Sequence, residues 1–332
     1  MRHKIRKGIR SLSNKNKWVG GVYSLLHNYK INSLMKLPDR QFAFKKYKTI
    51  TGKALNLDNP VTYDDKVWWL KLNNRDPLMT KCSDKYLVRD YVKERGLGQI
   101  LNELYGVYDN AEDIDFDMLP DRFILKTTHG CGGIIVCSAK AEFPVEKAVK
   151  RMNEGLSSNY FIQSREWNYK DIKPRIICER LFEKEESGEA GLVDYRFMCF
   201  DGVVKMVLVD IDTLDEKGSH RHDARRNVYD ENFNLLDIRF TRPRFDPALV
   251  PKPENFDEMR SFAEILSEPF PHCRVDFYNL KGKIVFGEIT FYHAGGSNII
   301  EPEEWETTLG GWIDLNSPKV IKQNDNERGA VI

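Results

Sequence analysis

The sequence predicts an α+β protein in which helices come first and antiparallel strands follow. Before residue 120 the apolar residues recur at helical spacing, whereas from residue 121 they fall in short β-rich runs separated by turn residues. At Asp201-Gly202, two such runs are joined by a dipeptide typical of a two-residue hairpin. This order favours an α+β fold over a parallel βαβ sheet.

Two helices are expected between residues 62 and 96. The first begins at Thr62, which forms a capping box with Asp65, and continues through apolar residues to Leu72. The second is expected to begin with Ser83 as its N-cap and to end at Gly96.

The remaining elements alternate between short strands and single helices. Strands are expected at 122–126, 134–137, 175–179, 195–200 and 203–210, with a last hairpin at 274–278 and 284–292. Helices are expected over 144–156 and 256–266. Residues 183–190 read as an exposed acidic loop, and 241–257, with four prolines, as an irregular connection.

Charge is distributed unevenly along the 332 residues. The net charge is +1, but residues 1–38 contain nine Lys or Arg and no acid. The rest of the chain has 42 basic and 50 acidic residues, a net charge of −8, so a basic arm precedes an acidic body. An acidic body argues against nucleic-acid binding, which needs a basic face on the folded part.

Composition also disfavours membrane-spanning and secreted classes. No apolar run approaches the ~18–20 residues of a membrane span, and the start of the chain lacks the apolar stretch and cleavage site of a signal peptide. The six cysteines are scattered without a CxxC pair, which indicates reduced thiols rather than disulfides or a zinc ribbon. We therefore expect a cytoplasmic protein.

The last hairpin carries the most informative residues. Asp276 and Glu288 lie six residues on either side of the turn glycine, so a regular hairpin places them opposite each other. The same register puts Arg274 beside Asp276 and Tyr278 opposite Phe286. Opposed carboxylates repel unless a cation neutralises them, which Mg²⁺ on phosphate oxygens does with few protein ligands. The alternative is that Arg274 pairs with one acid on a solvent-exposed face.

A glycine-rich turn lies between the strands predicted at 122–126 and 134–137. It contains Gly130, Gly132 and Gly133, and Lys126 is a charge in the strand before it. The stretch lacks the GK[ST] sequence and the following helix of a P-loop. A glycine hairpin can instead fold over phosphates and offer backbone N–H groups, with Lys126 as a point charge. An ordinary turn beside a surface lysine is the alternative.

Two more charged residues lie near the ends of predicted elements. Glu179 ends an apolar strand, where a buried acid can accept a hydrogen bond from an adenine amine while the backbone beyond reads the base edge. More often such a residue is simply the first exposed one. Lys85 lies in the first turn of a predicted helix, where a lysine is normally solvated.

The order of these features resembles the ATP-grasp superfamily. The RVDF segment with a later glutamate on the next strand is similar to the metal-binding segment of D-alanine–D-alanine ligases. The segments SDKY.VR.YV, LK..HG.GG, REW.Y..IKPRIICE, DYRF.CF.G and FGEITF.HAGG are similar to the TupA-like ATP-grasp family of polysaccharide biosynthesis, over residues 38–315. The resemblance implies an ATP-grasp fold, in which two α+β subdomains grip ATP.

The resemblance also implies a division of the chain. We expect a basic arm at 1–37, a helical N-terminal region at 38–120, a lid subdomain at 121–190, a C-terminal subdomain with the metal site at 191–320, and a tail at 321–332. The N-terminal βαβ domain usual in ATP-grasp enzymes is expected to be replaced by helices.

Most candidate residues are implied to bind the nucleotide. They are Lys85, Lys126, Gly130, Gly132, Gly133, Glu179, Arg180, Leu181, Phe182 and Asp194. The two lysines would contact phosphates, the glycines would form a mobile flap, Glu179 and the backbone of the next three residues would bind adenine, and Asp194 would bind ribose. His129, beside the flap glycines, is a further candidate for phosphate contact.

Five residues are implied to act at the metal or on the transferred phosphoryl group. Asp276 and Glu288 would hold Mg²⁺, and Arg274, with Lys126, would stabilise the phosphoryl group during transfer. Thr290 stands where most ATP-grasp enzymes have an asparagine ligand. Because a hydroxyl is a poorer ligand, the second metal site is expected to be weaker or held through water.

The implied activity is an ATP-dependent ligation of a carboxylate to an amine through an acyl phosphate. The family context implies that the carboxylate belongs to a uronic acid or its sugar nucleotide, in the synthesis of capsular or other cell-surface polysaccharide. The sequence does not identify the amine.

Two segments are candidates for binding the acceptor. HRHDARR contains His220, Arg221, His222, Arg225 and Arg226, whose cations could hold a carboxylate or a pyrophosphate. A zinc-binding tract and a solvated loop are the alternatives. HAGG contains His293, Gly295 and Gly296 and could form a substrate loop.

Other functions stay open at this point. A sugar kinase would use the same ATP apparatus, and a degenerate nucleotide-binding module of a polysaccharide assembly complex would bind ATP without catalysis. A glycosyltransferase would need its metal site at Asp210-Ile211-Asp212. The basic arm could hold the protein peripherally at the anionic inner face of the membrane. A solvated tail and a docking site for a partner are equal alternatives for the arm.

Overall fold

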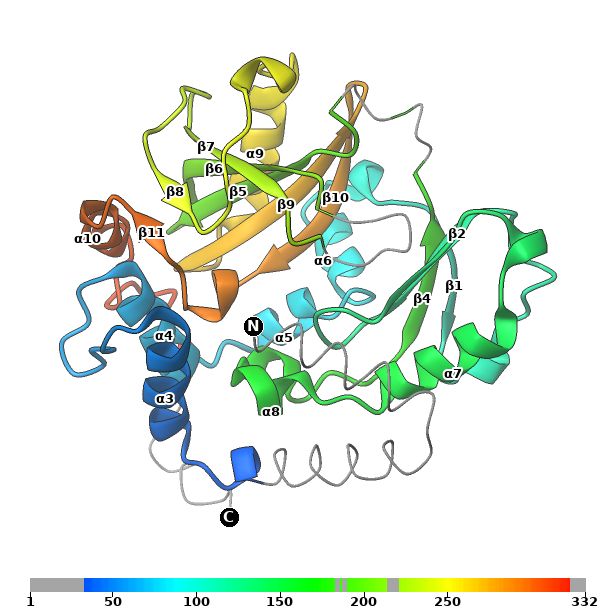
Figure 1. The fold of residues 1–332 in the computed structure, drawn as a ribbon, viewed down its shortest axis with the longest axis horizontal. Helices are drawn as coiled ribbons and strands as arrows, with labels where there is room; N and C mark the ends of the chain where they lie inside the picture. Colours follow the sequence, from blue (N-terminus) through cyan, green and yellow to red (C-terminus); the bar gives the residue numbers. More distant parts are fainter. Residues whose placement is uncertain (1–32, 183–185, 187–189, 214–220, 323–332) are drawn as a thin grey trace.

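The computed structural model describes residues 33–182, 186, 190–213 and 221–322. Two antiparallel sheets lie side by side, a smaller one that packs against α7 and a larger one with α9 against one face (Figure 1). The helices α3 and α4 lie at the opposite end of the molecule from the smaller sheet. We refer to the smaller sheet with α7 as the lid.

Within the described residues, the helices α3 Asp39–Thr51, α4 Tyr63–Asn73, α5 Pro77–Ser83 and α6 Val88–Glu94 precede the first strand. The predicted capping box of α4 is confirmed, because Thr62 Oγ1 accepts from the Asp65 N–H (3.3 Å) and the Asp65 carboxylate accepts from the Thr62 N–H (3.2 Å).

The predicted helix start at Ser83 is wrong. Ser83 is the last residue of α5, and its hydroxyl donates to Met79 O (2.7 Å). The next residue, Asp84, has an extended backbone that ends α5, and its carboxylate accepts from the N–H groups of Tyr86 and Leu87. This local turn delays α6 to Val88.

The lid sheet has the strand order β1-β4-β2-β3, with β1 Leu104–Tyr108, β2 Phe123–Thr127, β3 Ile134–Cys137 and β4 Ile176–Arg180. Its core is closed by α7 Val145–Leu156 through Met152, and α8 Tyr160–Ser164 follows. The strand β1 lies in the region expected to be helical and was not predicted, because all five of its residues are half-buried and show no alternation. The subdomain limits inferred from the sequence stay a prediction.

The large sheet has the order β10-β9-β5-β6-β7. Its strands are β5 Asp194–Phe200, β6 Val203–Ile211, β7 Arg225–Asp230, β9 His272–Leu280 and β10 Lys283–Thr290. Helix α9 Phe256–Ser267 packs on it around Phe197, Phe256 and Phe277. The predicted hairpin turn between β5 and β6 is confirmed, with φ of +53° at Asp201 and +85° at Gly202. The strand β7 was not predicted.

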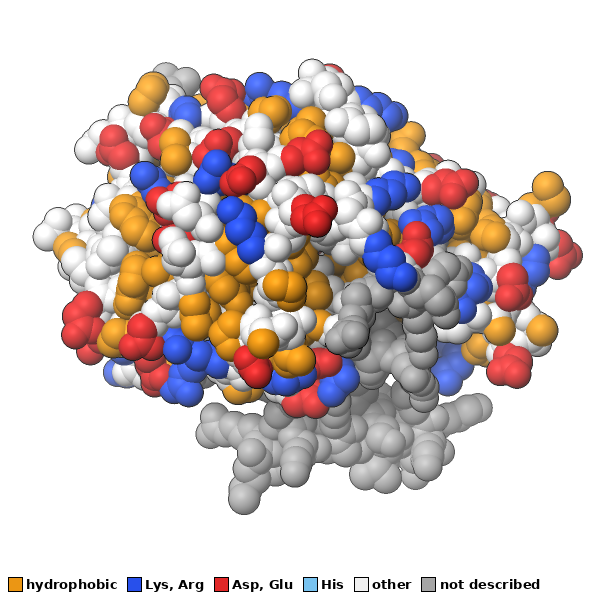
Figure 2. Space-filling model, turned by 90° about the horizontal axis from the view of Figure 1, so that it is seen from above, with side chains coloured by type: hydrophobic (Ala, Val, Ile, Leu, Met, Phe, Trp, Pro, Cys, Tyr) orange, Lys and Arg blue, Asp and Glu red, His pale blue; other side chains and the backbone are white. Residues whose placement is uncertain are grey.

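Smaller elements complete the described chain. Strands β8 Arg239–Phe240 and β11 Ile300–Glu301 pair, and α10 Glu304–Gly311 lies beside α4. The 3₁₀ helices are η1 Gly98–Ile100, η2 Ala111–Asp113, η3 Lys140–Glu142, η4 Trp167–Tyr169, η6 Pro247–Leu249 and η7 His293–Gly295. On the face seen in Figure 2, lysine and arginine side chains alternate with aspartate and glutamate. No helix within the described ranges is long and apolar enough to cross a bilayer.

Candidate active site

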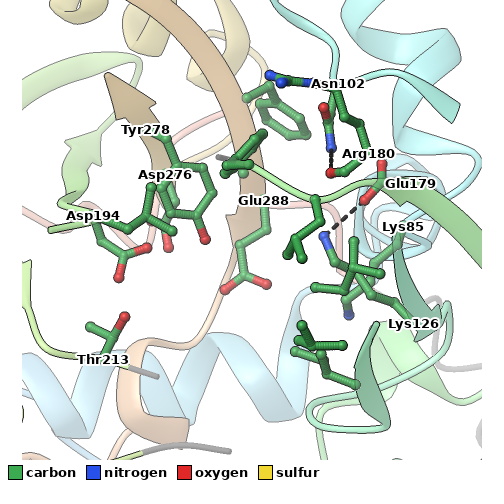
Figure 3. A pocket seen from close by; sticks show the side chains of 18 of the residues that line it. Lys85, Asn102, Lys126, Glu179, Arg180, Asp194, Thr213, Asp276, Tyr278 and Glu288 are labelled. Carbon is green, nitrogen blue, oxygen red and sulfur yellow. Dashed lines mark hydrogen bonds and ion pairs between the residues drawn. The ribbon is translucent and has the colours of Figure 1, made fainter. Parts of the chain in front are cut away.

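A cavity of about 820 Å³ separates the lid from the large sheet. One wall comes from the lid, where β2 carries Lys126 and β4 carries Glu179. The other wall comes from the large sheet, where β5 carries Asp194, β9 carries Asp276 and β10 carries Glu288. Figure 3 shows the two lysines, Lys85 and Lys126, across the cavity from these carboxylates. Residues from five distant parts of the chain thus face one space.

Asp276 and Glu288, the carboxylate pair, lie opposite each other on β9 and β10, as predicted. The expected partner of Tyr278 is wrong, because Tyr278 faces Val285 and Phe286 faces Phe277. Gly287 is the extra residue of a β-bulge that shifts the register between Phe286 and Glu288. A Cβ atom at Gly287 would lie 3.0 Å from Asp276 O, so the bulge brings the two backbones closer than another residue would allow.

Arg274 binds both members of the carboxylate pair. It donates two hydrogen bonds of 2.6 Å to Asp276 and one of 3.0 Å to Glu288. The Arg274 side chain is only 6% exposed, so the alternative that Arg274 pairs with one acid on a solvent-exposed face is wrong. A bidentate pair of this kind fixes the orientation of the guanidinium as well as its charge.

The carboxylate pair suits a divalent cation that is shared with phosphate. Glu288 is 45% exposed towards the cavity, while Asp276 is buried beside it. Burial alone would raise the pKa of Glu288, but Arg274 and Lys85 outweigh this and hold the pKa below its usual value. No group of three potential metal ligands occurs in the part of the chain that the structure describes. Phosphate or water oxygens would therefore complete the coordination of Mg²⁺. Thr290 donates to Glu288 (3.0 Å), and its role as a ligand stays a prediction.

Both predicted phosphate-binding lysines have partners within the protein. Lys126 donates to Glu179 (2.8 Å), whose other oxygen accepts from Arg89 (3.1 Å), and Lys85 donates to the flap carbonyl of Gly130 (2.7 Å). Glu179 is only 7% exposed, so the alternative that it is simply the first exposed residue after the strand is wrong. To reach a phosphate, each lysine must exchange its partner.

Beyond Glu179 the chain follows the rim of the cavity. The backbone of Arg180 is already bound at both ends: its N–H donates to Glu103 O (3.0 Å) and its carbonyl accepts from Asn102 (2.9 Å). Leu181 and Phe182 also line the cavity. The ring of Phe182 meets Tyr278 of the large sheet edge-on at 5.4 Å. The role of this segment towards adenine stays a prediction.

Asp194 opens β5 and lines the same cavity, as the predicted ribose site requires. It accepts from Arg196 (3.3 Å) and lies opposite Tyr278 on β9. Its role towards ribose stays a prediction.

The flap consists of residues 128–133. Gly133 has φ of +68°, and a Cβ there would lie 2.3 Å from Thr127 Oγ1, so only glycine fits without a shift. His129 is buried, and its Nε2 lies 3.1 Å from Ser158 O. Burial lowers the pKa of His129, which favours the neutral ring with Nε2–H as donor. Its contact with phosphate stays a prediction.

The HRHDARR residues do not form one loop. His220 lies outside the described residues, while Arg225 and Arg226 belong to β7. Arg226 is buried and bound to Asp210, and Arg225 pairs with Asp212 (2.7 Å). Arg221 pairs with Asp223 (2.6 Å) and lines the cavity; His222 is described but is not a cavity-lining residue. Of the described members, Arg221 alone lies at the cavity.

Asp210 cannot serve a glycosyltransferase metal site. It is fully buried and accepts from Arg226 (2.5 and 2.6 Å) and Arg242 (2.6 Å), with Arg196 at 3.1 Å. These guanidiniums occupy both oxygens, so the Asp210-Ile211-Asp212 interpretation is wrong.

The HAGG loop is held from behind by α4. Asp64 accepts from the backbone N–H and the side chain of Asn298 (2.7 Å each), and Lys71 donates to Gly295 O (2.6 Å). The loop brings His293 to Arg274, with Nδ1 2.7 Å from Nη1. Burial, followed by nearby arginines, lowers the pKa of His293, so the neutral ring accepts from Arg274. Gly296 packs against Trp68 and is buried.

Five residues that bind the site residues or support the HAGG loop were not predicted from the sequence: Asp64, Lys71, Arg89, Arg196 and Arg242. Period-two alternation from Asp194 could have placed Arg196 on the cavity face. Helical spacing could have placed Asp64 and Lys71 on one face of α4. Arg242 follows no periodic element, so no sequence pattern pointed to it.

Comparison with known proteins agrees with this geometry. A family model described as TupA-like ATPgrasp matches residues 65–314. A search of curated protein sequences gave no match.

The solved structures that match this chain include two D-alanine–D-alanine ligases and one synthetase. D-alanine–D-alanine ligase from Helicobacter pylori is 15% identical, with 76% of this chain and 69% of that chain covered and a TM-score of 0.42. D-cycloserine synthetase DcsG is 16% identical, with 70% of each chain covered and a TM-score of 0.39. D-alanine–D-alanine ligase from Bacillus anthracis, complexed with ATP, is 12% identical, with 64% and 55% covered and a TM-score of 0.36.

Proposed function

Because the chain belongs to the TupA-like ATP-grasp family, and is thus an ATP-dependent ligase that uses ATP and Mg²⁺, we propose that it joins the carboxylate of a uronic-acid acceptor to an amine. The acceptor is a uronic acid, free as a sugar nucleotide or within a capsular or cell-surface glycan. The product is an amide, with ADP and phosphate released.

The arrangement of charge across the cavity carries this proposal. Lys85 and Lys126 face the carboxylate pair, and Arg274 is fixed between that pair and His293. Phosphoryl transfer requires little covalent chemistry from a protein, because positioning and neutralisation of charge supply most of the catalysis. Cations on both walls of one cavity meet this requirement.

Each group has a defined task in the proposed reaction. The acceptor carboxylate oxygen attacks the γ-phosphorus of ATP, the bond to the β-phosphate oxygen breaks, and an acyl phosphate and ADP form. The amine nitrogen then attacks the acyl carbon, phosphate leaves, and the nitrogen loses a proton. Arg274 neutralises the charge of the transferring group, and Lys126 and Lys85 neutralise the phosphates. Asp276 and Glu288 would hold Mg²⁺, which supplies further charge neutralisation when bound.

ATP binding must first open contacts within the protein. Lys126 leaves Glu179 for the phosphates, and Arg89 keeps the released carboxylate neutralised from its other side. The freed oxygen of Glu179 can then accept from the adenine amine. Lys85 leaves Gly130 O in the same way, which couples nucleotide binding to the position of the flap.

The test is ADP release with Mg-ATP, UDP-glucuronate or UDP-galacturonate, and an amine drawn from glycine, ethanolamine and ammonia. We expect Glu288→Ala to lose more than about 100-fold in turnover. Glu258→Ala, an exposed acid on α9, serves as the matched control and should match the wild type. Equal turnover in Glu288→Ala and wild type would remove this residue from the site.

Hydroxylamine separates the ligase from the other functions open at the sequence level. It traps an acyl phosphate as a hydroxamate, whereas a sugar kinase leaves a stable phosphate ester and no hydroxamate. A degenerate module would bind Mg-ATP without releasing ADP.

Residues 1–32 of the basic arm lie outside the described residues, and the membrane contact of the arm belongs to the proposal. Nine cations without an acid are attracted to an anionic leaflet by about 1 kcal/mol each. Removal of residues 1–17 should leave turnover intact and abolish binding to phosphatidylserine vesicles. Unchanged vesicle binding would contradict the peripheral location.

A further inference from the structure

Four arginines from different parts of the large sheet meet next to the carboxylate pair. This arginine cluster comprises Arg196 of β5, Arg226 of β7, Arg242 after β8, and Arg274 of β9. Asp210 joins three of them, and His293 lies between Arg274 (2.7 Å) and Arg226 (3.4 Å). The cluster thus extends from the metal carboxylates to the connection between β8 and α9.

Arg242 differs from the rest of the cluster in its exposure and its pairing. Its side chain is 28% exposed, against 6% for Arg226 and 6% for Arg274. Among the described residues Asp210 is its only acidic partner. It contacts Asp210 Oδ2 at 2.6 Å, and the same oxygen accepts from Arg226 (2.6 Å) and lies 3.1 Å from Arg196. One carboxylate oxygen is therefore shared by three cations, and Arg242 keeps an incompletely neutralised, accessible charge.

Two other guanidiniums, those of Arg226 and Arg196, share Asp210 with Arg242. Burial lowers the pKa of Arg242 to about 10, and the neighbouring Arg226 and Arg196 add to the lowering against the opposite effect of Asp210. The same four arginines, after burial, lower the pKa of His293. An anion that reached the exposed side of Arg242 would relieve this crowding of like charges.

Binding of the metal would leave the site with an excess of positive charge. Four carboxylates, those of Asp194, Asp210, Asp276 and Glu288, face the four arginines. Two of these carboxylates would also neutralise Mg²⁺, so additional negative charge is needed from the ligands. The phosphates of ATP supply it on the lid side. Among the described residues, Arg242 is not part of the cavity lining; it is linked to Arg196, which does line the cavity, through the Asp210 carboxylate oxygen that both contact.

We propose that Arg242 binds a second anionic group of the acceptor, one that does not react. The inference rests on the proposed function, because it assumes that the reacting carboxylate lies at Arg274 and the carboxylate pair. Within the described residues Arg242 contacts Asp210 and neither Asp276 nor Glu288, so a different part of the acceptor must supply its anion. The acceptor therefore has at least two anionic groups, either adjacent uronate carboxylates of a glycan or the pyrophosphate of a sugar nucleotide. Both offer oxygen anions that an arginine binds well.

The experiment is calorimetric titration of the full chain saturated with Mg²⁺ and a non-hydrolysable ATP analogue, which prevents ligands from entering the nucleotide site. The ligands are galacturonate, digalacturonate and UDP-galacturonate. The proteins are wild type, Arg242→Ala and Arg244→Ala. Arg244 is the matched control, because it lies two residues away, is exposed and pairs with Asp237 instead.

The wild type should bind digalacturonate or UDP-galacturonate about tenfold more tightly than galacturonate, and Arg242→Ala should lose this preference. Arg244→Ala should retain it, and affinity for the ATP analogue should be the same in all three proteins. A preference for the disaccharide identifies a glycan acceptor, and one for UDP-galacturonate identifies a sugar nucleotide.

Three results would overturn the second anionic site: equal affinity of the wild type for all three ligands, a preserved preference in Arg242→Ala, or no binding of any ligand. The failure of the proposed ligation looks different. In that case the preference and its dependence on Arg242 are observed, but no amine produces ADP release.

Discussion

The two walls of the cavity hold their charges in different ways. On the lid, the Lys126 side chain donates to Glu179 and is 25% exposed. Lys85, which lies between α5 and α6, donates to the flap carbonyl of Gly130. On the large sheet, Arg274 makes four hydrogen bonds and is 6% exposed. The lid can therefore exchange partners when ATP enters, whereas the large sheet is oriented in advance.

This difference follows from the chemistry of the two kinds of side chain. A lysine ammonium on a flexible stem is easily redirected, while the planar guanidinium of arginine is fixed by bidentate contacts. Preorganised charge is worth more in catalysis than charge that must reorient. We therefore expect changes in the large sheet to reduce turnover and changes in the lid to reduce nucleotide affinity.

The largest effect is expected for Arg274→Lys. An ammonium cannot bind Asp276, Glu288 and His293 together, so turnover should fall by about 100-fold, or roughly 3 kcal/mol, with little change in the Kd of Mg-ATP. Steady-state ADP release and calorimetry measure the two quantities. A loss of nucleotide affinity as large as the loss of turnover would contradict the division between the walls.

The next effect concerns pH and the support behind the HAGG loop. Burial raises the pKa of Asp64 to about 7, so the folded state binds more protons than the unfolded state between about pH 4 and pH 7. Stability from this group is present below pH 4 and is lost as the pH rises towards 7. At about 1.4 kcal/mol per pKa unit, and allowing for relaxation, we expect a loss of about 2 kcal/mol.

Urea unfolding of wild type and Asp64→Asn from pH 4 to pH 7 measures this loss. The difference in the free energy of unfolding between the two proteins should change by about 2 kcal/mol in favour of the variant as the pH rises. A difference that is independent of pH would show that Asp64 ionises normally in the folded protein.

On the lid, Lys126→Met should weaken Mg-ATP binding by about tenfold, or roughly 1.4 kcal/mol, while thermal stability changes little. The reason is that Lys126 makes a single half-exposed ion pair and that Arg89 still neutralises Glu179 in its absence. Calorimetry and thermal unfolding measure the two effects. If Lys126→Met unfolded at a much lower temperature than Arg274→Lys, the ion pair of Lys126 with Glu179 would be needed for stability, and Lys126 would not be free to exchange Glu179 for phosphate.

The smallest effect is expected for an exchange of partners behind the loop. At pH 4, Asp64→Asn removes one acceptor of Asn298 and should cost about 1 kcal/mol in stability, with faster hydrogen exchange in residues 293–298. The double variant Asp64→Asn/Asn298→Asp restores a donor and an acceptor across the same gap. It should recover much of both losses, and a double variant worse than either single one would contradict the pairing.

Local sequence was enough for the parts of the site that depend on neighbours along the chain. The turn glycine and period-two alternation placed Asp276 opposite Glu288, and the order of Lys126, the glycine turn and Glu179 resembled one family, which the match over residues 65–314 confirms. The helix start at Ser83 was wrong, because the Asp84 side chain binds the backbone in a way that propensity does not distinguish from a cap.

The sequence by itself determined the class of fold, the family and the carboxylate pair, because hairpin register and motif order are local properties. Only the tertiary structure decided which charges meet. It buried Asp210 among three arginines, turned Lys126 towards Glu179, placed Asp64 and Lys71 behind the HAGG loop, and left Arg242 half-exposed beside the cluster. These contacts join residues from different sheets and helices. Their energies depend on burial and on the summed field of neighbours, and no pattern along the chain encodes either.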